Sequence, residues 1–134
     1  MRCRNINMGR MLFFRTIRAI LSFVFFAAGI AKLVGLPLAV IPFDVIGAGQ
    51  WFRYLTGLIE FGGALLLLTS RFVGVGGLML AVTMIGAVAA HLTVVPGTPL
   101  PAAVFLVVNL SIVWNYRTRF FKKSRGSQVF DATI

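Results

Sequence analysis

Four long apolar stretches constrain this chain more than any other feature of its sequence. They cover residues 14–35, 51–69, 72–94 and 101–116. A helix needs about 20 predominantly apolar residues to cross the hydrocarbon core of a bilayer, and each stretch is near that length. Because backbone groups in lipid must be hydrogen-bonded within the protein, each stretch is expected to be a helix. The pattern predicts an all-α fold, an integral membrane four-helix bundle.

The overall composition supports a membrane environment. Of the 134 residues, 59% are hydrophobic and 12% are charged, and the mean hydropathy is +0.95. Soluble domains are about 45–50% apolar and about 25% charged. A soluble fold of this size has too little interior to bury so much apolar surface, so lipid is expected to cover the remainder.

The first connection between apolar stretches carries helix-breaking residues. Residues 36–49 contain Pro37, Pro42, Gly47 and Gly49, which are expected to end one helix and to prevent another. The connection is otherwise apolar, so it is predicted to lie in the outer membrane interface or across the end of the bundle.

The remaining connections define the organisation of the chain. Residues 70–71 form a very short link, which predicts a tight antiparallel hairpin, and residues 95–101 form a proline-rich turn. Residues 122–134 are polar and are expected to be poorly ordered. Three parts are predicted: a basic cytoplasmic N-terminus at 1–13, a membrane domain at 14–117 and a basic cytoplasmic tail at 118–134.

Basic residues crowd at the two ends of the chain. The net charge is +10, from 13 lysines and arginines against 3 aspartates and glutamates. Ten of these basic residues lie before the uninterrupted apolar part of the first stretch, which begins at Ala19, or after the last stretch: Arg2, Arg4, Arg10, Arg15, Arg18, Arg117, Arg119, Lys122, Lys123 and Arg125. Cytoplasmic loops carry an excess of Lys and Arg, which predicts a multi-pass membrane protein with both termini cytoplasmic.

The same placement bears on partners. Basic groups beside apolar segments meet anionic lipid headgroups, so the lipid bilayer is expected as a partner and nucleic acid is not. One alternative for the N-terminus stays open, because Gly29-Ile30-Ala31 after a basic and apolar run also resembles a secretory signal with a cleavage site. Cys3 is the single cysteine, so no internal disulfide can form.

Glu60 is the most informative residue of the apolar stretches, because it lies near the middle of the second one. A charged side chain at the centre of a spanning helix costs about 2.5–3.5 kcal/mol on insertion scales and is a functional-site hypothesis by default. Arg53 and Gly57 share a helix face with it, since seven residues make nearly two turns. The separation of Arg53 and Glu60 along the helix axis is about 10 Å.

Three further ionisable residues are expected near Glu60. Because the spans alternate in direction, Lys32, Arg53 and His91 fall in the outer part of the membrane, with Asp44 in the loop above. This layer predicts a ligand or proton pocket that opens outward, with Glu60 at its floor. The alternative is that Lys32 and Arg53 extend to the interface and Glu60 pairs with a basic neighbour to hold the helices in register.

Other polar and small residues are assigned to packing. Small side chains let helices in lipid approach closely, and asparagine can hydrogen-bond between helices. This packing set comprises Gly57, Gly62, Gly63, Gly86, Ala90 and Asn109. His91 lacks a second histidine or a nearby cysteine, so no metal site is expected. No nucleophile–base pair is visible, so no catalytic residue is assigned and a stand-alone enzyme is not expected.

Several segments together resemble the DoxX family, in its broad DoxX-like branch. They are Ala28-Gly29-Ile30-Ala31-Lys32-Leu33, then Gly57-Leu58-Ile59-Glu60-Phe61-Gly62-Gly63-Ala64-Leu65-Leu66-Leu67, then Met84-Ile85-Gly86-Ala87 with His91-Leu92. The resemblance implies a small four-helix membrane protein of the bacterial inner membrane. It also implies, by analogy with the family's namesake, a quinone as ligand and a soluble oxidoreductase or another membrane subunit as partner. The chain shows no cofactor-binding signature of its own.

Three functions remain open at this point. The leading hypothesis is an accessory or anchor subunit that holds a quinone for a redox complex. The second is a small proton-linked transporter with Glu60 as its proton site, for which four spans suffice only in a homo-oligomer or around a narrow path. The third is a structural membrane protein that recruits a soluble protein through its basic ends.

Overall fold

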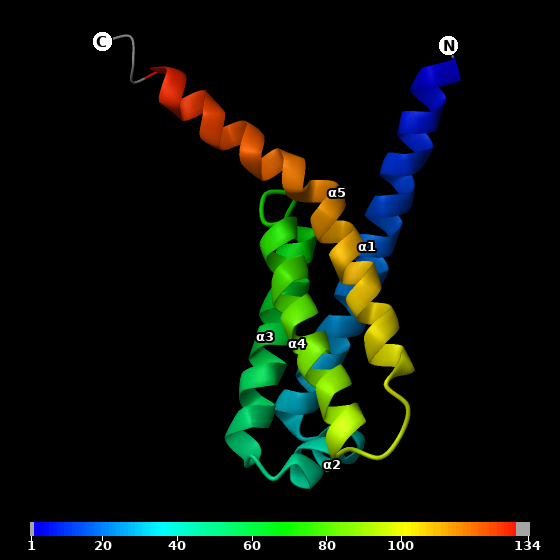
Figure 1. Ribbon diagram of the computed structural model, residues 1–134, viewed down its shortest axis with the longest axis vertical. Coiled ribbons are helices and arrows are strands. Elements are labelled where there is room, and N and C mark those ends of the chain that lie inside the picture. The colour runs from blue at the N-terminus through cyan, green and yellow to red at the C-terminus, as the bar shows by residue number, and fades with distance from the viewer. Residues whose placement is uncertain (1, 131–134) are drawn as a thin grey trace.

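The computed structural model describes residues 2–130, with the side chains of residues 8–9 and 11–117. Its described part contains five helices and no strand: α1 (Arg2–Val34), α2 (Pro37–Ile46), α3 (Gln50–Leu68), α4 (Val73–Thr93) and α5 (Leu100–Phe130). Four long helices lie side by side, and the short α2 crosses one end of them (Figure 1). The all-α prediction is confirmed.

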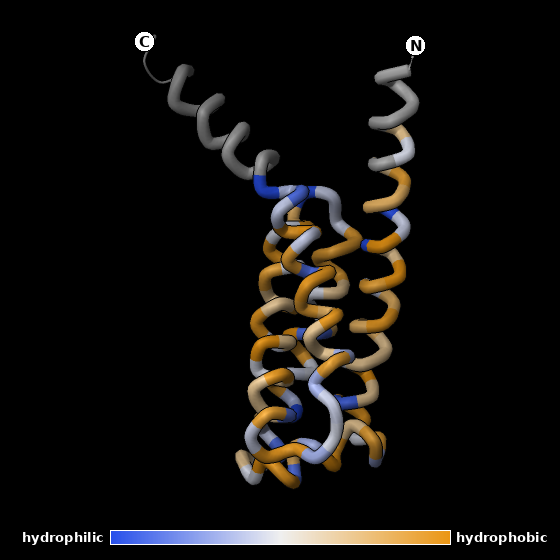
Figure 2. The backbone as a smooth tube through the Cα atoms, turned by 45° about the vertical axis from the view of Figure 1, so that its right-hand side comes forward, coloured by the Kyte–Doolittle hydropathy of each residue, from blue (hydrophilic) through white to orange (hydrophobic). Residues whose placement is uncertain are grey.

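Each of the four long helices contains a segment that is long and apolar enough to cross a membrane. These segments are Met11–Val34, Gln50–Leu68, Val73–Thr93 and Leu100–Arg117. Hydrophobic residues run along most of the bundle, interrupted by a few hydrophilic positions (Figure 2). The four predicted spans are therefore confirmed, and the chain is a multi-pass membrane protein.

The two ends of the bundle differ in what they carry. The start of α1, the end of α5 and the α3–α4 turn lie at one end, here called the termini end (Figure 1). Helix α2 and the loop of residues 94–99 lie at the other end, here called the α2 end (Figure 1). The start of α1 and the end of α5 therefore lie on the same side of the membrane, as an even number of spans requires. Which side is cytoplasmic remains a prediction.

The four long helices pack around a common centre, each in contact with two others. Helix α1 contacts α3, α3 contacts α4, and α4 contacts α5. The rings of Phe25 and Phe105, 5.5 Å apart at their centroids, join α1 to α5. Leu67, Leu80 and Ile112 are fully buried at the centre.

Glycines set the closest helix contacts. A Cβ added at Gly29 would lie 2.9 Å from the carbonyl oxygen of Gly57, and one at Gly76 would lie 2.7 Å from that of Gly63. No side chain fits at such distances, so these backbones touch directly, as small residues allow in lipid. Gly62 and Gly86 differ, because a Cβ on either would meet no atom within 4 Å. A packing role for these two would need a neighbour other than the described residues.

The prediction for residues 36–49 was wrong, because α2 is a helix. Pro37 stands at its start, where the missing N–H has no helical partner in any case and the ring's φ suits a helix. Pro42 lies inside α2 and removes one hydrogen bond. Packing of Phe43 compensates, since its side chain is buried. The predicted location was right, because α2 contacts α1 and α3 across the end of the bundle.

The polar stretch near the C-terminus also differs from its prediction. Helix α5 continues to Phe130, where the sequence predicts a poorly ordered tail from residue 122 onward. Extending a helix that has already formed is far easier than nucleating a new one. Residues 131–134 lie outside the described residues.

Candidate functional site

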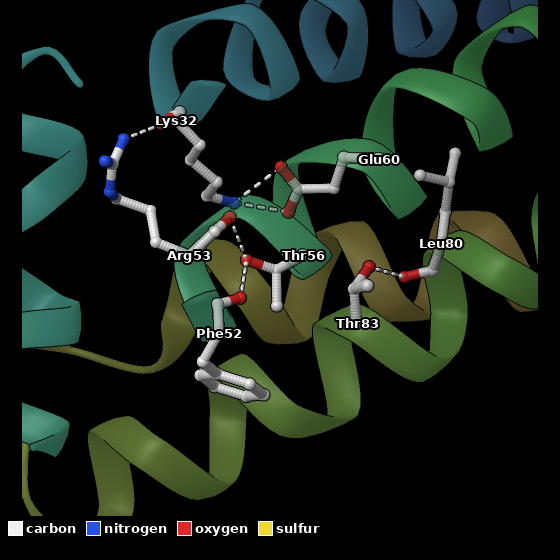
Figure 3. A network of polar contacts seen from close by, with 7 residues as sticks. All are labelled: Lys32, Phe52, Arg53, Thr56, Glu60, Leu80 and Thr83. Atoms are coloured by element: carbon white, nitrogen blue, oxygen red, sulfur yellow. Dashed lines mark hydrogen bonds and ion pairs between the residues drawn. The ribbon is translucent and has the colours of Figure 1, made fainter. Parts of the chain in front are cut away.

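The acid in the membrane interior forms an ion pair with the lysine at the end of the first span. Lys32 lies in the last turn of α1 and Glu60 in the middle of α3. The Lys32 ammonium donates to both carboxylate oxygens of Glu60, each at 2.5 Å (Figure 3). The Glu60 side chain is 2% exposed and the Lys32 side chain is 19% exposed. The pair is thus almost enclosed, with Lys32 as its accessible member.

A glycine contact brings these two charges together. Gly57 stands one turn before Glu60 on α3 and faces α1, where a Cβ on it would lie 3.1 Å from the Lys32 Cβ. Gly29, one turn before Lys32, meets the Gly57 carbonyl from the other side. Because neither glycine has a side chain, α1 and α3 approach closely enough for the lysine to reach the carboxylate. Gly57 therefore serves the site as well as packing.

Arg53 lies beside the pair but turns away from Glu60. Its Nη1 donates to the carbonyl oxygen of Lys32 (Figure 3), and its Nε donates to Gln50 Oε1 at 2.6 Å. The guanidinium carbon lies 4.3 Å from the centre of the Tyr54 ring. The helix face predicted from the spacing is confirmed, since Arg53, Gly57 and Glu60 are all buried. The arginine binds the lysine's backbone, and the lysine binds the acid.

Helix α2 lies beside the lysine of the ion pair. The ring of Phe43 lies 5.9 Å from the Lys32 ammonium and meets the Phe52 ring edge-on at 5.9 Å. An ammonium group near an aromatic face is attracted by the ring quadrupole. Gln50 Nε2 also donates to Asp44 Oδ1 on α2 at 2.6 Å. Polar contacts therefore run from exposed Asp44 through Gln50 and Arg53 to the lysine.

His91 lies apart from this cluster. It stands near the end of α4 and is half-buried. Its Nδ1 is buried without a hydrogen-bond partner, and a Cβ on Gly97 in the following loop would lie 3.9 Å from its ring. Among the described residues, no hydrogen bond or ion pair links His91 to Lys32, Arg53 or Glu60. The structure therefore joins three of the four predicted residues and places the fourth against the loop of residues 94–99.

Two more polar side chains, Ser22 and Asn109, are buried between the ion pair and the termini end of the bundle. The Ser22 hydroxyl of α1 donates to the carbonyl oxygen of Ala64 at 2.7 Å. Asn109, fully buried on α5, donates through Nδ2 to Phe105 O at 2.8 Å, while its Oδ1 has no partner. The sequence-based reasoning missed Ser22, although a polar residue inside the first apolar stretch is a visible signal.

Gln50 and Phe43 were also missed as members of the site. Gln50 stands three residues before Arg53 on the same helix face, which is a signal that the sequence carries. Phe43 had no such signal, because its region was predicted to be non-helical. Among the described residues, no group of three or more His, Cys, Asp or Glu side chains is placed to hold a metal ion.

The four spans that carry these residues match a known family. The family model of the DoxX-like family matches residues 16–114, which include all of α2, α3 and α4 and most of the spanning parts of α1 and α5. The chain belongs to the DoxX-like family. No curated protein and no solved structure matches it. The resemblance predicted from the sequence segments is confirmed.

The chemistry available to this DoxX-like protein follows from its buried pair. Lys32 offers an ammonium that donates to the Glu60 carboxylate and lies 5.9 Å from the centre of the Phe43 ring of α2. An ion pair in hydrocarbon is stable only while both members remain together, because a single buried charge is strongly disfavoured. A ligand that engages Lys32 will therefore also perturb Glu60.

Proposed function

We propose that this DoxX-like protein is a small membrane subunit that holds a quinone beside the Lys32–Glu60 pair for an oxidoreductase partner. The observation that carries the proposal is the ion pair itself, an acid 2% exposed and a lysine 19% exposed in otherwise apolar spans. Intramembrane ionisable residues are rare and mark ligand or proton pathways.

The chemistry of the pair suits a quinone. A quinone is a lipophilic ring whose carbonyl oxygens need hydrogen-bond donors, and an ammonium carries three of them. Two donors of Lys32 point at Glu60, which leaves the third for a carbonyl. Conversion of a quinone to a quinol takes two electrons and two protons. The partner supplies the two electrons and the aqueous phase supplies the two protons, each of which the Glu60 carboxylate can accept and then pass to the quinone.

The surroundings also suit a flat lipophilic ring. The aromatic rings of Phe43 and Phe52 lie on the α2 side of Lys32, where a quinone ring could stack against them. The proposal places the protein in the bacterial inner membrane with its basic ends in the cytoplasm, where a soluble partner would dock.

The test is the quinone content of the purified protein. Gentle detergent extraction followed by solvent extraction and mass spectrometry should find quinone in the wild-type protein. Lys32→Met/Glu60→Met, which removes both charges together, should abolish it. The matched control is Asp44→Asn, which alters a polar contact on α2 without touching either charge, and it should retain quinone.

Two results would contradict the proposal. The first is wild-type protein that carries no quinone after gentle extraction and binds none when it is added back. The second is equal quinone retention by the wild type and the double variant. If quinone is absent and reconstituted vesicles instead show proton flux that depends on Glu60, the proton-linked transporter becomes the better hypothesis.

A further inference from the structure

We propose that Arg53 binds the phosphate group of a phospholipid at the α2 end of the bundle. This site is separate from the quinone site at Lys32 and Glu60 and does not depend on it. Three features carry the inference: an unbalanced buried charge, a free donor on that charge, and an apolar surround fitted to acyl chains.

The first feature is the charge of Arg53. The side chain is 5% exposed, yet its partners are the Lys32 carbonyl, the Gln50 amide oxygen and the Tyr54 ring, all of them neutral. Lys32 and Glu60 form the one ion pair among the described residues, and their charges cancel. A buried guanidinium without an anion is costly. The structure therefore leaves one positive charge that a bound anion would balance.

Asp44 does not fill this role. Its carboxylate accepts from Gln50 Nε2 rather than from the guanidinium, and no salt bridge joins it to Arg53 within the described part of the chain. Both Asp44 and Gln50 are exposed, so solvent screens the contact. The described residues therefore supply no counterion for Arg53.

The second feature is the geometry of the guanidinium. Its Nε and Nη1 are engaged, while its Nη2 donates no hydrogen bond to any described residue. Gly35 lies against this group with φ +84°, and a Cβ there would lie 3.3 Å from Nη1 and 3.7 Å from Nη2. Because Gly35 has no side chain, the guanidinium can lie against the corner between α1 and α2. The planar fork of arginine is well matched to phosphate oxygens.

The third feature is the position of Arg53 in the bundle. It lies in the first turn of α3, at the α2 end of a spanning segment, where lipid headgroups are found. Val34, Leu36 and Leu38 expose large apolar side chains at the adjacent corner, with Leu38 87% exposed. A ligand that meets both a cation and this apolar surface must itself be amphipathic. A phospholipid, with a phosphate and acyl chains, fits both, whereas free phosphate fits the cation alone.

The experiment measures phospholipid that stays with the purified protein. After extensive detergent washing, phosphorus analysis and native mass spectrometry should find one phospholipid per wild-type chain. Arg53→Gln should lower the retained amount about tenfold, because a charge-assisted contact is lost. The matched control is Arg71→Gln, since Arg71 is an exposed arginine in the α3–α4 turn at the other end of the bundle. It should retain phospholipid like the wild type.

A second variant guards against misfolding. Arg53→Lys keeps the buried charge but loses the fork, so it should fold and bind phospholipid less tightly than the wild type. Added phosphatidylglycerol vesicles should raise the melting temperature of washed wild-type protein and leave that of Arg53→Gln unchanged. Inorganic phosphate at the same concentration should not raise it.

Several outcomes would overturn the proposal. Equal phospholipid retention by wild type, Arg53→Gln and Arg71→Gln would show that Arg53 holds no headgroup and only extends to the interface. Stabilisation by inorganic phosphate as strong as that by vesicles would show a simple anion site in place of a lipid site. Failure of the quinone proposal would look different, because the Lys32→Met/Glu60→Met protein should still retain phospholipid.

Discussion

Removing one member of the Lys32–Glu60 pair should destabilise the protein far more than removing both. We consider Lys32→Met and Glu60→Met, singly and together, because methionine is unbranched and apolar and fills the space of either side chain. Lys32→Met leaves a carboxylate that is 2% exposed, while Glu60→Met leaves an ammonium whose side chain is 19% exposed. The double variant leaves no charge at this place.

The size of the effect follows from the geometry. With the ammonium nitrogen 2.5 Å from each carboxylate oxygen, the attraction is about 6–7 kcal/mol at an effective dielectric of about 20. Loss of hydration offsets part of it, and breaking a buried pair typically costs about 3–5 kcal/mol. We expect Lys32→Met to lie at the upper end of that range, because its stranded partner is the more buried. The double variant should be close to neutral, since apolar replacement of a buried pair often is.

The assay is reversible unfolding in mixed micelles, followed by the helical circular dichroism signal as the denaturing detergent fraction rises. The four proteins form a double-mutant cycle, and the expected coupling energy is about 6 kcal/mol or more, because each single variant should lose about 3–5 kcal/mol and the double variant almost none. Asp44→Asn serves as the control for a contact between exposed groups and should change stability by less than about 1 kcal/mol. Additive single effects, or a single variant within 1 kcal/mol of the wild type, would refute the reasoning.

Two further predictions concern the glycine contacts between helices and the buried side chain of Asn109. Gly76→Ala should lose about 1–3 kcal/mol in the same unfolding assay, because its Cβ would lie 2.7 Å from a backbone oxygen. Gly86→Ala, whose Cβ would meet no atom, should be neutral or slightly stabilising because alanine favours helix; equal losses at both glycines would contradict the contact geometry. Asn109→Leu should raise stability by about 1 kcal/mol, since it removes a buried oxygen without a partner. A loss of stability instead would mean that this oxygen is hydrogen-bonded in the membrane.

The candidate site was partly predictable from helix geometry. The spacing of Arg53, Gly57 and Glu60 places them on one face of α3, and the alternation of the spans places Lys32 at a similar depth. These statements depend on rise and periodicity, which are properties of a single helix. They do not specify how each helix is rotated toward its neighbours. The structure pairs Lys32 with Glu60, turns Arg53 toward the Lys32 backbone, and leaves His91 beside the loop of residues 94–99.

The sequence alone also could not predict which glycines make close contacts between helices. Gly63 touches α4 closely, while its neighbour Gly62 faces open space, as does Gly86. A glycine permits a close contact but does not create one, because the contact also needs a backbone on the opposite helix. Helix α2 shows the same limit, since a proline-containing segment became helical where other helices gave Phe43 a buried place.

The sequence by itself determined that this chain crosses a membrane four times through helices and that an acid lies within one of them. Transfer into lipid depends on the composition and length of each segment taken alone, so these features can be read locally. The tertiary structure decided which basic group neutralises the acid, which glycines touch, and that Arg53 has no anionic partner in the described part of the chain. Those outcomes depend on side chains far apart in the chain meeting in space, and no single segment carries that information.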